Sequence, residues 1–334
     1  MTLSFYETRS KSSLGLKEFS SSDYSQKFSK AFEKCDFISR IIASISLSVL
    51  ALSILTGSFP SSILINQTPL SLQTALDKKG IEANVIPSSE WFVAAYGGAP
   101  YTYPSDVRVT ELETKDFTVK NVEWRGLPFI NPIYYGARIV RWFSNARIGG
   151  MLDFTHSKAI SVKDQKVLFQ NNLQAETSSR EVLIKDIFHR LEASHGHNML
   201  TMNGMLRLPS LSQVVSPYVG LGVGVSLPHA EVHLTEDSSR TYEYQLAGPV
   251  GQALIGFEIR LPVFSYFIEY KFTFADYRMP LSGQDGYILF TDLWRQFKRW
   301  YEKKQPIDGW VETNFSSHQV IGGLGVRLKS AYAN

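Results

Sequence analysis

The sequence predicts an all-β fold: an eight-stranded antiparallel transmembrane outer-membrane β-barrel with long extracellular loops, preceded by an N-terminal signal segment. Three observations lead to this prediction. Stretches of the chain alternate apolar and polar residues with a period of two. The polar face of these stretches carries charges and glycines, and the connections between them are alternately long and short.

Eight segments alternate with the period of a β-strand, and each has about the 9–11 residues, plus overhang, that a tilted strand needs to cross a bilayer. They are residues 91–101, 133–143, 148–157, 195–208, 217–227, 250–261, 264–276 and 313–328. In the seventh segment Phe264, Tyr266 and Ile268 share one face, whereas Glu269 and Lys271 share the other. The apolar face is rich in aromatic residues at its ends. This favours a lipid-facing exterior over a soluble eight-stranded lipid-binding barrel, the alternative that alternation also allows.

The stretch SPYVGLGVGVSL places Gly220, Gly222 and Gly224 on one face of a predicted strand. Glycine weakens a strand because it loses more backbone entropy than other residues and offers no side chain to pack. The lumen of an eight-stranded barrel has room for little beyond side chains. We therefore expect these glycines to relieve crowding in a lumen filled by long charged side chains, while Leu221 and Val223 face lipid.

The connections provide an independent test of the barrel. The long connections are 102–132, 158–194, 228–249 and 277–312. The short connections are 144–147, 209–216 and 262–263. Outer-membrane barrels have short periplasmic turns and longer extracellular loops. The pattern therefore predicts that both ends of the barrel sequence lie in the periplasm.

The chain divides by composition into three parts: a signal or export segment (1–58), a periplasmic linker (59–90) and the barrel (91–334). The uncharged run 41–56 follows a long basic stretch. It is short for a membrane-spanning helix and suits the core of a cleaved export signal, with a retained inner-membrane anchor as the alternative. Cleavage would remove Cys35, the only cysteine, so no disulfide is expected.

Composition argues against several classes of function. The net charge is only +3, and no basic stripe is interleaved with aromatic residues that could stack on bases, so nucleic acid is not an expected partner. The sequence has no glycine-rich phosphate loop and no flavin or nicotinamide motif. The expected partners are outer-membrane lipid and lipopolysaccharide, and the barrel is expected to be a monomer.

The predicted topology brings the histidines to the outer rim of the barrel. They are His156, His189, His195, His197, His229, His233 and His318. Carboxylates gather there as well: Asp153, Glu192, Glu231, Asp276 and Glu312. Histidine titrates near neutrality and is the commonest metal ligand, so this collection could bind a metal or transfer protons. No ligand spacing is diagnostic, and polar histidines also collect in ordinary loops.

The last long connection contains the sequence LFTDLWRQFKRWYEKK, which has the period of an amphipathic helix. Its aromatic positions are i, i+4, i+7 and i+11: Phe290, Trp294, Phe297 and Tyr301. Basic residues occupy the rest of the surface, which is typical of a helix at a membrane interface. Two interpretations remain open: a helix that contacts lipopolysaccharide phosphates, or a helix that plugs the barrel mouth with its aromatic face.

Several motifs together resemble the outer-membrane lipid A oxidases of Gram-negative bacteria. They are YYGARIVRWF, LDFTHSK, HGHNMLTMNGMLRLP, SPYVGLGVGVSLPHAEV, TYEYQLAGP and FIEYKFTFAD, in this order along 91–328. The resemblance implies an eight-stranded barrel that uses molecular oxygen to oxidise the proximal glucosamine of lipid A to 2-aminogluconate. The chain departs from many such barrels because it ends in RLKSAYAN rather than in an aromatic residue.

A site hypothesis follows from the resemblance and the rim residues together. Because no organic cofactor motif is present, a divalent first-row metal is the expected cofactor. The expected metal ligands or proton carriers are His156, His195, His229 and Glu231, supported by Asp153, and the residues expected to hold substrate phosphates are Arg295, Lys298 and Arg299. The alternative is a non-enzymatic, opacity-type surface protein whose outer loops bind a ligand or host.

Overall fold

The computed structural model describes residues 89–111, 114–143, 147–173, 179–212, 214–237, 240–304 and 309–329. The expected signal segment, nearly all of the expected linker and Cys35 lie outside the described residues. Among the described residues, no helix combines the length and the apolar character needed to cross a membrane.

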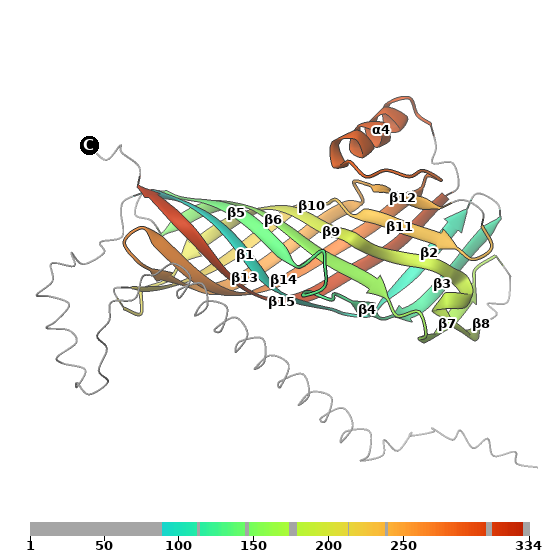
Figure 1. The fold of residues 1–334 in the computed structure, drawn as a ribbon, viewed down its shortest axis with the longest axis horizontal. Helices are drawn as coiled ribbons and strands as arrows, with labels where there is room; N and C mark the ends of the chain where they lie inside the picture. Colours follow the sequence, from blue (N-terminus) through green and yellow to red (C-terminus); the bar gives the residue numbers. More distant parts are fainter. Residues whose placement is uncertain are drawn as a thin grey trace, which may run out of the picture. The chain divides into compact units, whose positions relative to one another are not determined.

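Eight strands form a closed antiparallel ring (Figure 1). They are β1 (Glu90–Thr102), β5 (Tyr135–Trp142), β6 (Ile148–Ser161), β9 (Phe188–Arg207), β10 (Val215–Ser226), β13 (Gly248–Arg260), β14 (Phe264–Leu281) and β15 (Gly309–Lys329). Each strand pairs with the next in this order, and β15 pairs with β1 to close the barrel. The predicted eight-stranded barrel is confirmed, but several strands extend further at the outer end than predicted; β9, for example, begins at Phe188 rather than at residue 195.

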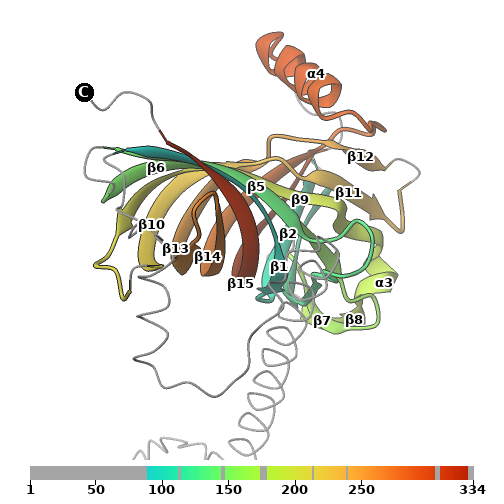
Figure 2. The same cartoon turned by 60° about the vertical axis from the view of Figure 1, so that its left-hand side comes forward.

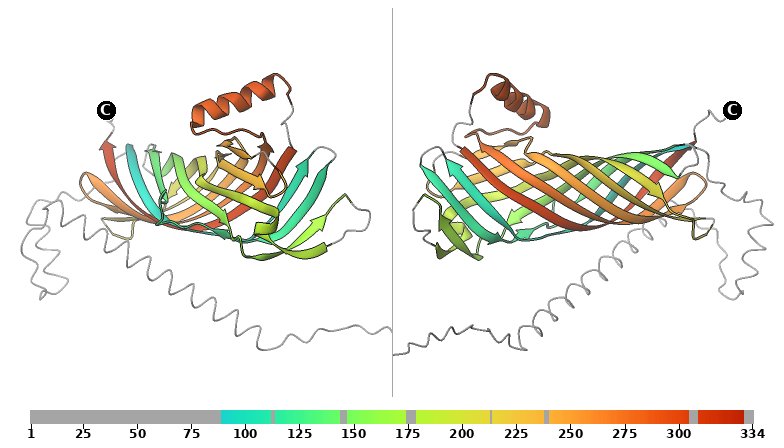
Figure 3. Two further views of the ribbon diagram at one scale, coloured as in Figure 1. Left: turned by 45° about the vertical axis from the view of Figure 1, so that its right-hand side comes forward. Right: turned by 180° about the vertical axis from the view of Figure 1, so that it is seen from behind.

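The predicted long loops contain additional structure at the outer end of the barrel. The added strands are β2 (Ser105–Glu111), β3 (Lys115–Val122), β4 (Trp124–Arg125), β7 (Lys166–Asn171), β8 (Ser179–Leu183), β11 (His229–Leu234) and β12 (Thr241–Tyr244). Two helices accompany them, α3 (Ile184–Ile187) and α4 (Leu289–Tyr301). The strand β2 pairs with the start of β15, and β11 pairs with the start of β9, so these strands extend the wall of the barrel (Figure 3).

The exterior of the barrel is apolar, as the alternation predicts. Leu221, Val223 and Met202 are 72%, 73% and 70% exposed, and apolar side chains occupy the same outward face of the other ring strands. A soluble protein of this size would not leave so large an apolar surface in water. The chain is therefore an outer-membrane β-barrel whose exposed band contacts lipid.

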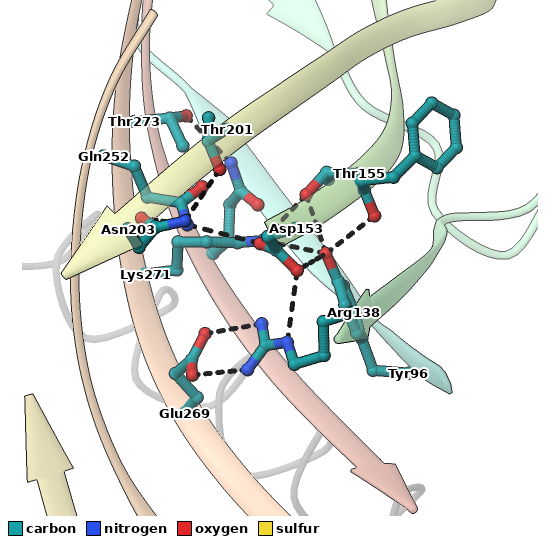
Figure 4. Close-up of polar contacts among 12 residues, drawn as sticks. Tyr96, Arg138, Asp153, Thr155, Thr201, Asn203, Gln252, Glu269, Lys271 and Thr273 are labelled. Carbon is teal, nitrogen blue, oxygen red and sulfur yellow. Dashed lines mark hydrogen bonds and ion pairs between the residues drawn. The ribbon is translucent and has the colours of Figure 1, made fainter. Parts of the chain in front are cut away.

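Charged side chains are buried inside the barrel, and Figure 4 shows the polar contacts among them. Arg138 donates to both oxygens of Glu269, at 2.7 and 3.0 Å, and to Asp153 at 3.1 Å. Lys271 donates to the other oxygen of Asp153 at 3.1 Å, and the Tyr96 hydroxyl donates to Asp153 at 2.9 Å. Two cations thus face two carboxylates, which offsets the cost of taking these charges out of water.

Little free space remains in the lumen beside Arg138. A second ionic group, Glu90 with Arg207, Glu258 and Arg260, lies towards the periplasmic end. The cavity bordered by Arg138, Glu258 and aromatic side chains has a volume of about 20 Å³, which is about enough for one water molecule. This cavity is far too small for a sugar.

Above the lipid band, the interior of the barrel changes from ionic to apolar. Val107, Val109, Val119, Phe188 and Val311 belong to one buried apolar cluster that β2, β3, β9 and β15 form with the neighbouring strands. This outer extension has an apolar inside and polar residues outside, as in a soluble β-protein. Its outer face can therefore carry functional polar side chains next to the membrane surface.

Substitutions at Val223 and Gly222 test the assignment of the inner and outer faces. Val223→Arg should impair assembly, because a cation in the lipid band costs about 2–4 kcal/mol near the midplane. Gly222→Leu should also impair assembly, because a Cβ there would lie 2.1 Å from the Asn203 side-chain oxygen in the lumen. The folded fraction is measured by heat-modifiable migration in detergent gels. Leu173→Arg, an exposed position in the outer extension, is the control and should assemble normally; normal assembly of all three variants would contradict the assignment.

Epitope tags test the orientation of the barrel. A tag inserted after Lys163, in the outer extension, should be accessible to antibody on intact cells. A tag after Ser210, in the short connection between β9 and β10, should become accessible only after the outer membrane is opened. The reverse pattern would show that the barrel has the opposite orientation.

Candidate functional site

The candidate site lies on the outer face of the barrel wall, just above the lipid band. Along β10 and its continuation, Val223 and Val225 are exposed on the lipid-facing side. Ala230 and Val232 of β11 point into the apolar interior. Because side chains alternate along a strand, His229 and Glu231 lie on the outer face.

Three potential metal ligands meet at this position. One ligand atom from each of His195, His229 and Glu231 lies within 4.8 Å of the other two. The Nδ1 of His195 is 2.6 Å from Glu231 Oε1, and the Nδ1 of His229 is 3.5 Å from the same oxygen. His229 and Glu231 are buried, whereas the His195 side chain is half exposed. The cluster therefore has one accessible side.

The hydrogen bond of His229 determines which ring nitrogen is available. Its Nε2–H donates to the carbonyl oxygen of Gly286 at 2.9 Å, so Nδ1 carries the lone pair in the neutral ring. This nitrogen is buried and has no hydrogen-bond partner among the described residues. A lone pair that faces a carboxylate needs a proton or a cation between the two groups. A histidine held by a backbone carbonyl on its far nitrogen is also the usual arrangement of a metal ligand.

Two neighbouring carboxylates differ in their tendency to ionise. Burial alone would raise the pKa of Glu231, but its interaction with the His229 imidazole and the hydrogen bonds from His195 and Ser194 hold it at about 2. Burial and the Glu231 carboxylate raise the pKa of Glu192, which lies opposite Glu231 in the β9–β11 pairing. Arg190 donates to both carboxylates, at 2.7 and 3.0 Å. Glu231 thus remains an anionic acceptor, while Glu192 is the better of the two at holding a proton.

Tyrosines enclose the histidines, and the sequence analysis assigned them no role. The rings of Tyr242 and Tyr244 approach His229 edge-on, with centroids 4.4 and 4.7 Å away. The Tyr242 hydroxyl lies 3.1 Å from His195 Nδ1, and burial raises the pKa of Tyr242. Both tyrosines come from the motif TYEYQLAGP. Its alternation predicts a strand that presents both rings to one side, but only the hairpin of β11 and β12 brings them to His229.

Two of the predicted site residues do not join this cluster. His156 lies on the outer wall, where its Nδ1 donates to Asn198 Oδ1 at 2.7 Å and its ring stacks on Tyr135. Asp153 lies three residues earlier on β6 and therefore points into the lumen, where it belongs to the ionic network. The expectation that Asp153 supports the histidines needs correction, since side chains three residues apart on a strand occupy opposite faces.

The remaining histidines occupy separate positions. His197 points inward and its Nδ1 is hydrogen-bonded to the Tyr277 hydroxyl. His233 Nε2 donates to the Asp237 carbonyl at 3.1 Å, and its ring lies near that of His189. His318 lies on the exterior beside Tyr103 and Tyr270. The outer rim therefore gathers all seven histidines, but only two of them enter the group of three ligands.

The helix α4 lies outside the barrel wall, alongside β12 (Figures 1 and 2). Its polar face is turned to the wall: Arg295 contacts Asp292 at 2.6 Å and Glu243 at 3.4 Å, and Arg299 contacts Glu243 at 2.9 Å. The Lys298 side chain is largely exposed. The interpretation of α4 as a plug with its aromatic face in the barrel mouth is therefore wrong. Arg295 and Arg299 could contact a phosphate only while they share it with these carboxylates.

No protein-family model and no curated protein matches the sequence. Among solved structures, the chain is similar to Neisserial surface protein A (NspA), with 10% identity and a TM-score of 0.29 over 71% of this chain and 96% of that one. It is also similar to Ail of Yersinia pestis, with 12% identity and a TM-score of 0.29 over 73% and 100%. Likenesses this low carry no argument about the site, and the resemblance to lipid A oxidases stays a prediction.

Acidification should weaken the site through Glu231. The folded-state pKa of about 2 lies below the ordinary value of 4.5. The stabilisation is therefore complete above about pH 4.5 and is lost as the pH falls towards 2, a change on the order of 3 kcal/mol. Urea unfolding of the refolded protein in detergent micelles, repeated between pH 6 and 2, should show a steeper loss for the wild type than for Glu231→Gln. The exposed Glu236→Gln should behave as the wild type does; equal pH dependence in all three proteins would contradict the assignment.

Proposed function

We propose that this barrel is a lipid A oxidase that acts in the outer leaflet and uses molecular oxygen to convert the proximal glucosamine to 2-aminogluconate. The observation that carries the proposal is the cluster of His195, His229 and Glu231 on the outer face of the wall, directly above the lipid band. A lipid headgroup would reach this position without leaving the membrane. The filled lumen supports the same placement.

The ligand set suits a metal that reacts with oxygen. Two imidazoles and one carboxylate with open positions are typical of non-haem iron(II) oxygenases. The unpartnered Nδ1 of His229 fits a divalent first-row ion held by His195, His229 and Glu231. When bound, such an ion would supply the electron transfer to oxygen that amino-acid side chains alone do not provide.

The surrounding residues would orient the sugar and move protons. Oxidation of a free anomeric carbon removes two electrons and two protons, which oxygen accepts to form hydrogen peroxide; water then opens the resulting lactone to the acid. Glu192, whose pKa is raised, is placed to take up and release a proton. Tyr242 contacts the exposed His195 and Arg190 contacts Glu231, and both could hold sugar hydroxyls. The substrate must lack a phosphate on C1, because only a free hydroxyl there can be oxidised.

Cobalt(II) binding tests the ligand set independently of activity. The purified, folded protein should bind one Co²⁺, with absorption bands in the visible range. His229→Ala should weaken binding by about tenfold or more, because it removes one of three protein ligands. His233→Ala removes a histidine from the same strand but outside the cluster, and it should bind as the wild type does. Equal binding by the two variants would rule out this set of ligands.

Mass spectrometry of lipid A tests the reaction. In a host whose lipid A lacks the C1 phosphate, the wild type should add one oxygen atom to the proximal unit, and only in air. His195→Ala and His229→Ala should lose the product while their barrels still show heat-modifiable migration; His233→Ala should keep it. Unmodified lipid A in cells that contain correctly folded wild-type protein would refute the oxidase and leave the non-enzymatic surface protein as the better reading.

A further inference from the structure

A large apolar groove lies between α4 and the outer wall of the barrel. Its volume is about 880 Å³, within the ~300–1,000 Å³ range of ligand sites. The wall contributes Leu227, Leu246, Pro280 and Trp310, and the helix contributes Leu293, Phe297 and Trp300 among others. The groove lies outside the lumen, and the proposed reaction gives no role to its apolar lining.

The orientation of α4 explains why the groove is apolar. In a soluble protein an amphipathic helix turns its apolar side to the core. Here Asp292, Arg295 and Arg299 face the wall in ion pairs, while Phe290 and Tyr301 on the opposite side are 81% and 76% exposed. Leu293 and Trp300 lie on the flank between these two sides and line the groove. The helix is held by polar contacts and turns its aromatic side outward, which is the arrangement expected where the surroundings are lipid.

One residue of the groove wall, Leu227, lies between the lipid-facing surface and the candidate site along the chain. Leu227 is the next outward position after Val223 and Val225, which are exposed in the apolar band. The following outward position is His229. Neighbouring positions on one face of a strand are about 6–7 Å apart. The wall of the groove at Leu227 is therefore about one such step from His229.

Cations lie at the helix end of the groove. Arg299, Lys303 and Lys304 line it together with the apolar residues. Arg299 pairs with Glu243, and Lys304 pairs with Glu302. Lys303 follows shortly after the end of the helix and is exposed. An apolar channel with a cationic border is complementary to a lipid that carries both an acyl chain and a phosphate.

We propose that this groove holds one acyl chain of lipid A and so positions the unphosphorylated proximal sugar beside His195, His229 and Glu231, with the phosphate of the distal sugar towards the cations. The inference rests on the proposed function for the identity of the lipid, but binding can be measured whether or not oxidation occurs. The aromatic side of α4 would lie among the neighbouring lipid chains. The groove thus provides the selectivity for an acylated substrate that the small polar site alone would lack.

Native mass spectrometry of the full chain in detergent tests the groove, with 4′-monophosphoryl lipid A as the probe. The wild type should retain one molecule of the probe. Leu246→Glu and Leu293→Glu each place a carboxylate in the apolar lining and should reduce retention by roughly tenfold. Leu173→Glu introduces the same charge at an exposed leucine far along the sequence from the groove residues and is the matched control. Equal retention of the probe by all four folded proteins would overturn the proposal that the groove binds an acyl chain.

Two further probes identify what the groove recognises. The deacylated sugar phosphate should not be retained, because the acyl chain makes the main contact; retention equal to that of the acylated probe would overturn the inference. Dioleoylphosphatidylglycerol should be retained less than lipid A, and equal or better retention would overturn lipid A as the occupant. A wild type that retains lipid A without oxidising it would refute the proposed oxidase activity but support the binding of lipid A in the groove. Oxidation that Leu246→Glu leaves unaffected would refute only the role of the groove.

Discussion

The pairing of charges inside a narrow lumen is the constraint on which the rest of this barrel depends. Arg138 and Lys271 are fully buried together with Glu269 and Asp153. Removal of one member would leave an uncompensated charge in a space with little room for water, whereas the complete group balances its desolvation cost with charge and hydrogen bonds. Because the ionic group fills the lumen at this level, the proposed function is assigned to the cluster on the outer face of the wall.

The inward and outward faces of the wall exchange their polarity above the membrane, and this exchange allows the outer surface there to carry ionisable side chains. Within the membrane, the outward positions are apolar and the inward positions are charged. In the extension above it, the inward positions are apolar, as at Ala230 and Val232, so the outward positions His229 and Glu231 can be polar. A single line of alternate residues thus passes from lipid contact to a buried acid–histidine pair. Few other arrangements would place ionisable groups so close to a lipid headgroup with no intervening pore.

The sequence predicted the barrel well because a transmembrane strand must satisfy one simple rule: its side chains alternate between the lipid and the lumen. Alternation identifies the faces of Leu221 and Gly222, and the long and short connections identify the two ends. The same rule does not predict β2, β11 or β12, since a short strand in an extension has neither a bilayer thickness to span nor a uniform outer face. Histidine composition indicated the rim, but the grouping of His195 with His229 depends on the pairing of β11 with β9. Tyr242 reaches the cluster through the β11–β12 hairpin, and Gly286 through its backbone carbonyl. Neither contact can be recognised from a pattern of residue types in the sequence.

The helix α4 shows how an amphipathic pattern can be identified correctly while its orientation stays open. The spacing of Phe290, Trp294 and Phe297 predicts a helix with one aromatic side, and periodicity alone cannot distinguish a protein core from a lipid phase as its partner. The deciding residue is Glu243, on β12: it is buried, and it binds Arg295 and Arg299. A carboxylate at that position fixes the basic side of the helix to the wall, and the aromatic side must then face away from it. The two long-range ion pairs of Glu243 thus determine the orientation of α4, and the helix forms one wall of an external groove rather than a plug.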